Sequence, residues 1–322
     1  MTEIETLQTS IGRAVVLHRL ALAIECRDAL SDRPTNTSVG VRYRRLPSAT
    51  NPNPPWRPRR EPGVVDVADP LRGPGRALGG AGTVAGLAAV GAAGVGVQLS
   101  RNGSGQFTLR HVIPDDPLRP LPQLELVVDD PSRRYVPRRF TVTPWTYAAV
   151  REPAPFVVGR ARLLRLWLRP GSAYAFPRTH TMVRGRIALA DGTPVRWARV
   201  EGTTPTSVAG WAHADERGEF VLPVTDPGYD PIRDFPRNLV VTLVVTADSA
   251  ARKPDPKDRA ADLVSEVIPR SSNPPSDAEL DNEVLRGTAL PPGYVPNTAT
   301  ARQVTVPVGA AVNLTEDVVF AP

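Results

Sequence analysis

The chain has 322 residues, which is room for two domains, and its 39 basic and 33 acidic residues leave a formal charge of +6. Its single cysteine excludes an intrachain disulfide and a cysteine-ligated zinc cluster, and only four scattered histidines argue against a dense metal or catalytic site. All but two of the basic residues are arginines, which is typical of a GC-rich genome and is weaker evidence for nucleic-acid binding. We therefore expect a globular protein with no cofactor, no catalytic residues and no nucleic-acid partner.

The first residues, Met1–Thr6, carry acidic side chains and no basic ones. A secretory signal needs positive charge at its start, followed by an apolar run. The sequence therefore predicts no export signal and a cytoplasmic protein.

Apolar and polar residues alternate with period two in several stretches of the first half, which is typical of half-buried strands. These stretches are residues 20–26, 39–44, 124–128 and 164–168. Proline and glycine separate them, so we expect many short strands joined by turns.

A long insertion interrupts this half at about residues 51–97, first rich in proline and then in glycine and alanine. The uncharged stretch Ala77–Ser100 is long enough to cross a bilayer. Glycine and alanine contribute little transfer free energy, however, and no aromatic belt flanks the stretch. We expect no membrane span, and we expect the insertion to become ordered only against another subunit.

The second half continues with the same alternation over residues 183–189 and closes with short apolar strands over 304–320. Residues 239–245 are apolar at nearly every position, which predicts a central strand buried on both faces. Short strands at close spacing favour an antiparallel sandwich over alternating strands and helices.

Two short helices are predicted inside a polar, proline-rich excursion from the second half, at about residues 250–300. Apolar residues at helical spacing predict the first helix over 260–267. Ser276 and Glu279 have the spacing of a capping box, which predicts the start of the second, and Gly287 is its expected stop.

Two turn-and-strand motifs occur twice in the chain. The first is Asp32–Pro34 and again Asp191–Pro194, each followed by a strand; the second is Gly103–Leu109 and again Glu216–Leu222. The first copy is longer by about the length of the 51–97 region. We therefore interpret the chain as an internal repeat whose first copy carries the insertion.

The residues that carry this pattern in the second half resemble the carboxypeptidase-regulatory-like, or prealbumin-like (transthyretin-like), β-sandwich family. They are Val183–Ile187, Asp191–Val195, Ala198–Val200, Ala214–Leu222 and Val304–Phe320. In the first half the resemblance depends on the two repeated turns alone.

The resemblance implies an all-β fold of two tandem antiparallel prealbumin-like (Ig-like) β-sandwich domains with long insertions and a few short helices. The expected domains are residues 1–177 and 178–322. The family is mostly non-catalytic and acts in accessory folding, adhesion, sugar binding or assembly. Its iron dioxygenases use a His-x-His pair, which this sequence lacks.

Clustered arginines beside aromatic residues are the strongest candidates for a binding site. Arginine pairs with carboxylates through two donors and is enriched at protein interfaces. The partner-binding residues predicted on this basis are Trp56, Arg57, Arg59, Arg60, Arg133, Arg134, Arg138 and Arg139. Acidic residues concentrate over 255–283, which favours contact between subunits.

The sequence favours a non-enzymatic structural or assembly protein whose partners are other protein subunits, or further copies of itself. By analogy, such a chain suits the cap or baseplate of a bacterial phage-tail-like contractile injection particle. The alternative is a carbohydrate- or peptide-binding module, which requires Trp145, Trp197 or Trp211 to line an exposed groove.

Overall fold

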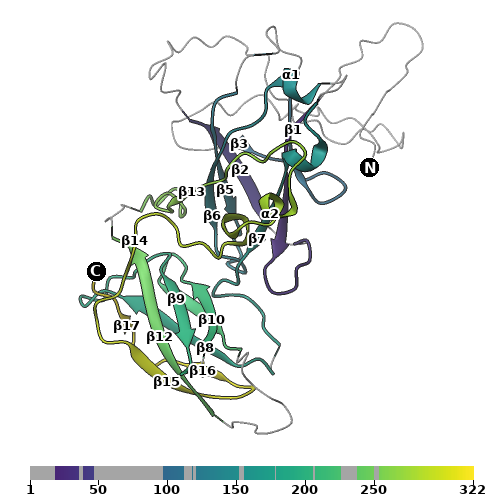
Figure 1. Ribbon diagram of the computed structural model, residues 1–322. Coiled ribbons are helices and arrows are strands. Elements are labelled where there is room, and N and C mark those ends of the chain that lie inside the picture. Colours follow the sequence, from purple (N-terminus) through teal and green to yellow (C-terminus); the bar gives the residue numbers. More distant parts are fainter. Residues whose placement is uncertain are drawn as a thin grey trace, which may run out of the picture.

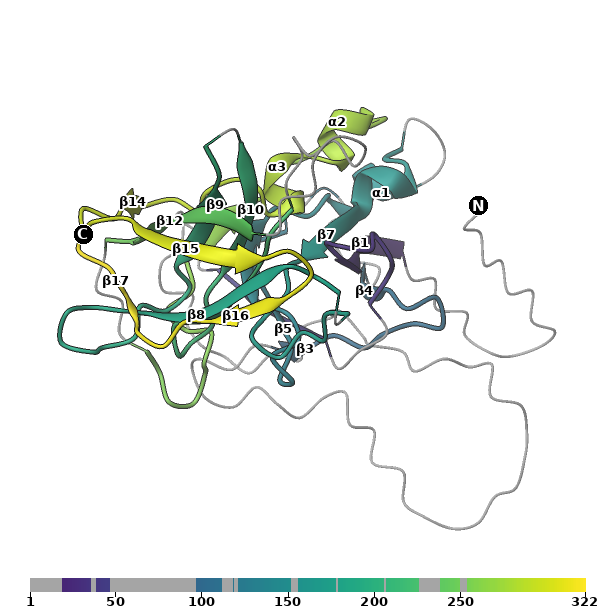
Figure 2. The ribbon, with the colours of Figure 1, turned by 90° about the horizontal axis from the view of Figure 1, so that it is seen from below.

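The computed structural model describes residues 19–35, 39–46, 97–111, 118, 121–151, 156–177, 179–205, 207–225, 238–249 and 254–322. Strands dominate these residues and the helices are short, so the predicted all-β class is confirmed. The strands form four sheets around two separate hydrophobic cores (Figure 1 and Figure 2).

Within the described ranges, no helix has the length and apolar content to cross a membrane. Most of the uncharged stretch 77–100, and nearly all of the insertion at 51–97, lies outside those ranges.

Two sheets enclose the first core, which is built mainly from residues of the first half of the chain. One has the order β4 (Phe107–His111), β1 (Arg19–Asp28), β7 (Leu163–Leu168). The other has the order β13 (Ser265–Val267), β6 (Arg138–Val142), β5 (Leu124–Asp129), β2 (Gly40–Arg45), β3 (Val97–Gln98).

Two further sheets enclose the second core. One has the order β10 (Val208–His213), β9 (Arg199–Thr203), β12 (Asn238–Asp248), β14 (Tyr294–Pro296), and β15 (Arg302–Pro307) also pairs with β12. The other has the order β11 (Glu219–Pro223), β8 (Met182–Ala188), β16 (Ala311–Asn313), and β17 (Val318–Val319) also pairs with β8.

The helical elements among the described residues have four residues each. They are α1 (Tyr147–Val150), the 3-10 helix Gly159–Arg162, α2 (Asp277–Leu280) and α3 (Glu283–Arg286). Ser276 and Glu279 form the predicted capping box at the start of α2. The single helix predicted from this box to Gly287 is divided in two, because α2 ends at Leu280 and Asn282 caps a new helix, α3. Gly287 follows α3 with φ of 68° and ends it, because glycine adopts the left-handed conformation without a steric penalty.

The predicted antiparallel arrangement is only partly correct: the sheet of β10, β9, β12, β14 and β15 is antiparallel throughout, and the other three sheets are mixed. Strand pairs β1–β7, β13–β6, β16–β8 and β17–β8 are parallel. A tight hairpin joins antiparallel neighbours, whereas parallel neighbours need a crossover connection. The paired strands of each parallel ladder are far apart in the sequence, so no turn signal predicts them.

The repeated turns have the same backbone features in both copies. Asp32 and Gly192 occupy equivalent positions with φ of 54° and 83°. Two residues later, Pro34 makes a bridge to Arg27, and Pro194 makes a bridge to Ala188. The first repeated motif therefore folds in the same way twice.

The second repeated turn has the same correspondence. Gly105 and Gly218 have φ of 82° and 75°, and each precedes by two residues a buried phenylalanine, Phe107 or Phe220. A Cβ on Gly218 would lie 2.4 Å from the carbonyl oxygen of Ile187, so this position requires glycine both for its φ and for space. Strands β1 and β8 also have equivalent roles, since each has an antiparallel neighbour on one side and parallel neighbours on the other.

The helix predicted over 260–267 does not form. Residues 259–262 make turns, and Ser265–Val267 form strand β13, which pairs with β6 of the first core. Ala260 and Leu263 pack against Trp197, whereas Val267 is 64% exposed at the edge of the sheet. Pairing with the free edge of β6 satisfies the backbone of this segment, so tertiary contacts override its helical spacing.

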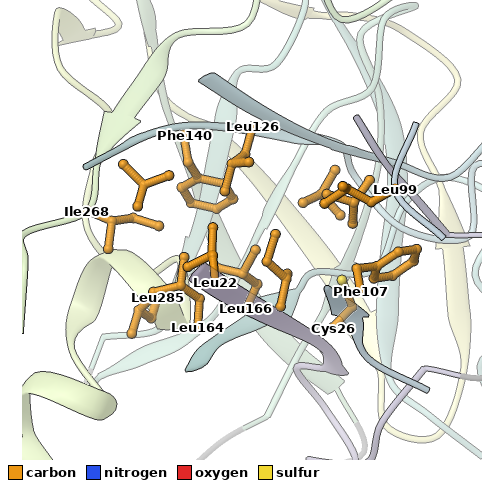
Figure 3. Packing of buried hydrophobic residues seen from close by; sticks show 14 of the residues in the cluster. Leu22, Cys26, Leu99, Phe107, Leu126, Phe140, Leu164, Leu166, Ile268 and Leu285 are labelled. Carbon is orange, nitrogen blue, oxygen red and sulfur yellow. The ribbon is translucent and has the colours of Figure 1, made fainter. Parts of the chain in front are cut away.

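The predicted excursion at 250–300 contributes side chains to the first core. Ile268, which follows β13, and Leu285 of α3 pack beside Phe140 and Leu164 (Figure 3). The chain thus leaves the second core after β12, covers one end of the first core and returns at β14 (Figure 1).

Strand β12 departs from the prediction that both its faces are buried. Its residues alternate between buried and accessible positions, with Val241, Leu243 and Val245 in the second core. On the opposite face Val240 is 47% exposed and Val244 is 39% exposed. Valine and threonine are β-branched and favour strands even where they face solvent. Their presence at these outward positions makes the sequence resemble that of a fully buried strand.

The large side chain of Phe220 offers a test of the second core. It is 1% exposed, and replacing it with alanine should lower the free energy of unfolding by about 3–5 kcal/mol, because the substitution leaves a cavity. Chemical denaturation of the full chain measures the change. A loss below about 1 kcal/mol would show that the side chain is not packed as described.

Candidate functional site

The predicted partner-binding residues fall into two groups. Trp56, Arg57, Arg59 and Arg60 lie outside the described residues. Arg133, Arg134, Arg138 and Arg139 lie in β6 and the turn before it, where the two cores meet. Each of these four arginines contacts groups of its own chain.

Arg138 has the most extensive contacts of this group. Its Nε and Nη2 donate to Glu266 of β13 at 3.1 and 2.9 Å, and its Nη1 donates to the carbonyl oxygens of Trp167 and Leu285 at 3.2 and 2.9 Å. Both side chains of the pair are about nine-tenths buried, with 8% and 10% exposed. One guanidinium therefore joins β6, β7, β13 and α3.

Two of the other three arginines make hydrogen bonds or ion pairs, and the third contacts aromatic rings. Arg139 donates to the carbonyl oxygens of Ala260 and Ala261 at 2.7 and 3.0 Å. Arg133 pairs with Glu216 of the second core at 2.6 Å. The guanidinium of Arg134 lies over the rings of Tyr135 and Tyr174, 5.7 and 5.4 Å from their centroids. Cation–π contact adds to the stability of such packing.

A second point of attachment is the strained turn before β9. Trp197 has φ of 63°, an unfavourable value for a large residue, and is 4% exposed. Its indole Nε1 donates to Asp262 at 2.9 Å, and Arg196 pairs with the same carboxylate. The Trp197 carbonyl oxygen accepts from the hydroxyl of Tyr294 at 2.8 Å. These contacts hold the turn in its strained conformation.

Acidic residues of the 255–283 region pair with arginines of the same chain. Asp258 accepts from Arg42 at 2.9 Å, and Asp262 and Glu266 accept from Arg196 and Arg138. The expected pairing of arginine with carboxylate therefore occurs within the chain at these positions. The sequence does contain a signal for this contact, because an acidic region and an arginine-rich first half carry opposite charges.

His213 of β10 lies in the pocket at the junction between the cores. Its Nδ1 lies 3.2 Å from the carbonyl oxygen of Trp197, which fixes that nitrogen as the proton donor. Burial lowers the pKa of His213 to about 3, with further lowering by nearby arginines. The imidazole is therefore neutral near pH 7.

Cys26 points into the first core and is 3% exposed (Figure 3). Burial raises the pKa of its thiol to about 12, so the reactive thiolate is not populated near pH 7. Across the described ranges, no three side chains of histidine, cysteine, aspartate or glutamate gather in a group that could hold a metal ion.

The outward face of the sheet β10–β9–β12–β15 is the most distinctive open surface of the second half. We call it the outer face and define it by Val208, Thr203, Val240, Thr242, Val244 and Thr305. Several of these residues are cross-strand partners: Thr203 lies opposite both Val208 and Thr242, and Val240 lies opposite Thr305.

The six residues that define the outer face are valines and threonines, and none of them is charged. Val208, Val240 and Val244 are 50%, 47% and 39% exposed. Glu201, opposite Val244, lies 3.6 Å from Arg199, so its charge is compensated. Large apolar side chains exposed on one face of a sheet make that face a candidate interaction surface.

No protein-family model matches the chain, and neither a curated protein nor a solved structure matches it.

The Arg138–Glu266 pair gives a stability prediction. Replacing Glu266 by glutamine leaves a buried guanidinium without its counter-charge and should lower the free energy of unfolding by about 3–5 kcal/mol. Equilibrium denaturation in urea measures this change. The double variant Arg138→Met/Glu266→Leu should recover much of the loss, because it removes both buried charges together.

Glu316 provides the matched control, because its side chain is 81% exposed and lies 3.6 Å from Arg302. The variant Glu316→Gln should lose less than about 1 kcal/mol. Equal losses for Glu266→Gln and Glu316→Gln would contradict the role assigned to the buried pair.

His213 predicts a specific pH dependence of stability. Its pKa is about 3 when folded and about 6.5 when unfolded, so the unfolded chain binds a proton first as the pH falls. The stability contributed by the neutral imidazole is complete above pH 6.5 and decreases as the pH falls toward 3.

Between pH 7.5 and pH 5, the wild type should lose about 1–2 kcal/mol more free energy of unfolding than His213→Asn. The exposed His180 supplies the control, since His180→Asn should retain the wild-type dependence. Denaturation curves at several pH values provide the measurement, and identical dependence in wild type and His213→Asn would refute the prediction.

Proposed function

We propose that the protein is a non-enzymatic structural subunit of a larger protein assembly. The observation that carries the proposal is the outer face, where Val208, Val240 and Val244 are exposed together on a sheet whose other side is fully packed. Exposed valines on a regular sheet cost solubility, and burial against a partner offsets that cost. The partners are other protein subunits or further copies of the chain.

Two tandem prealbumin-like β-sandwiches, residues 1–177 and 178–322, form the proposed architecture. The repeated turns support it, because Asp32 and Gly105 have the same conformations as Gly192 and Gly218. The equivalent positions of β1 and β8 in their sheets give further support. The segment at 250–300 belongs to the second unit in sequence but pairs with the first.

A cytoplasmic bacterial particle of the contractile, phage-tail-like type is the proposed setting, with the protein in its cap or baseplate. The argument is one of analogy. A subunit of such a particle must transmit force without deforming, and the ion pairs of Arg133, Arg138 and Arg196 join the two cores and the segment between them. The insertion at 51–97 supplies a further candidate contact with neighbouring subunits.

The carbohydrate- or peptide-binding alternative has less support, because the three tryptophans that it requires are covered. Trp197 is 4% exposed. Guanidiniums of Arg169 and Arg199 lie 3.8 and 4.1 Å from the ring centroid of Trp211. Arg270 lies 4.6 Å from that of Trp145. A sugar ring would have to displace these cations to stack on an indole.

The outer face is tested by the double variant Val240→Glu/Val244→Glu. These side chains already point to solvent, so the variant should keep the wild-type melting temperature. The charges should prevent burial against a partner. In native lysate separated by sedimentation, we expect the wild type in high-mass fractions and the variant in the fractions of free subunit.

Val319, which is 45% exposed on β17, supplies the matched control Val319→Glu, expected to sediment as the wild type does. A double variant that still sediments with the assembly would show that another surface makes the contact. A wild-type chain found entirely as free subunit would overturn the assembly proposal.

A further inference from the structure

Arg169 is a cation without a carboxylate partner at the junction of the two cores. It follows β7, and its guanidinium lies 3.8 Å from the ring centroid of Trp211 on β10. Its Nη2 donates to the carbonyl oxygen of Arg286 at 3.3 Å. Its Nε is buried and has no hydrogen-bond acceptor among the residues that the structure describes.

The positive charges of three other guanidiniums repel that of Arg169, and each of the three has its own carboxylate partner. Arg138 pairs with Glu266 at 2.9 Å, Arg199 lies 3.6 Å from Glu201, and Arg286 pairs with Asp281. No carboxylate in the described ranges lies within ion-pair distance of Arg169. One positive charge at this place is therefore uncompensated.

The environment of Arg169 is unfavourable for a charge. Burial, together with the charges of Arg138, Arg199 and Arg286, lowers the pKa of Arg169 to about 10. A partly buried guanidinium next to like charges destabilises the structure unless an anion compensates it.

A pocket lies beside this guanidinium. It is a small, open pocket with a cavity volume of about 40 Å³, and Arg138, Arg139, Arg169 and Glu266 contribute its charged lining. The remaining wall is largely apolar or aromatic and includes Val136, Leu263, Trp197 and Tyr294. Apolar walls with a few convergent polar groups are typical of a small-molecule site.

We propose that this pocket binds a carboxylate group, carried either by a small organic acid or by an acidic side chain of a peptide. Arg138 and Glu266 neutralise each other, whereas Glu125 lies 3.8 Å from Arg139 and pairs more closely with Arg44 at 2.7 Å. Among the described residues Arg169 is the lining guanidinium with no carboxylate within ion-pair distance, so it is left for a negatively charged ligand. The fork of donors on a guanidinium matches the two oxygens of a carboxylate.

The carboxylate of Glu266 in the lining disfavours a phosphate. A second negative charge on the ligand would be repelled by Glu266. Arg138 could not offset this repulsion, because it is already paired with Glu266. The apolar wall favours a ligand with carbon next to its charged group. This site is separate from the outer face, so it does not depend on the assembly proposal.

Thermal unfolding and calorimetric titration of the full chain test the pocket. The probes are sodium propionate, an acetylated and amidated glutamate peptide, and sodium phosphate, each at matched ionic strength against chloride. We expect propionate, the peptide or both to raise the melting temperature in a saturable manner. Binding of one carboxylate probe and not the other identifies the source of the group.

Arg169→Gln should weaken binding of the carboxylate probe at least tenfold. Arg184→Gln, on β8 outside the pocket, is the matched control and should bind as the wild type does. Arg169→Lys keeps the charge without the fork, should bind with intermediate affinity, and provides the test if Arg169→Gln fails to fold.

Three results would overturn the proposal. The first is the absence of saturable stabilisation by either carboxylate probe. The second is unchanged affinity in Arg169→Gln, or in Arg169→Lys if the glutamine variant does not fold. The third is stabilisation by phosphate alone, which would assign the pocket to a dianion.

Discussion

The buried pair between Arg138 and Glu266 is the interaction on which the arrangement of the two halves depends. Charges removed from water are tolerated only when both are paired and their remaining donors and acceptors are satisfied. Here the guanidinium meets that requirement by also donating to the carbonyl oxygens of Trp167 and Leu285. Strand β13 and helix α3 are thereby held on the first core, and any other position for them would leave Arg138 unpaired.

From this pair the rest of the junction follows. With β13 beside β6, Ile268 and Leu285 complete the first core (Figure 3). The preceding turns bring Asp258 to Arg42 and Asp262 to Arg196 and Trp197. Asp258, Asp262 and Glu266 of the segment are thus used in joining the cores. The outer face of the sheet β10–β9–β12–β15 is left as a surface of exposed valine and threonine side chains.

Arginine, rather than lysine, makes this junction feasible. The planar guanidinium offers five donors in fixed directions, so one side chain reaches a carboxylate and several carbonyl oxygens together. Arg196 shows this use, donating to Asp262 and to the carbonyl oxygens of Glu216 and Arg259. Arg169 uses its guanidinium differently, since the described residues supply it with no carboxylate, and its place in the lining of the pocket suits an external anion.

What the sequence by itself determined is local. Alternating apolar residues identified most of the longer strands, positive-φ turns at Gly192 and Gly218 followed from their residue types, and the capping box located α2. The tertiary structure alone decided that residues 265–267 form a strand, that β1 pairs in parallel with β7, and that Val240 and Val244 face outward. It also decided which carboxylate each arginine meets. Turns and caps are satisfied by groups a few residues away, whereas these choices depend on partners far along the chain that compete for the same edge or charge, and only the folded packing selects among them.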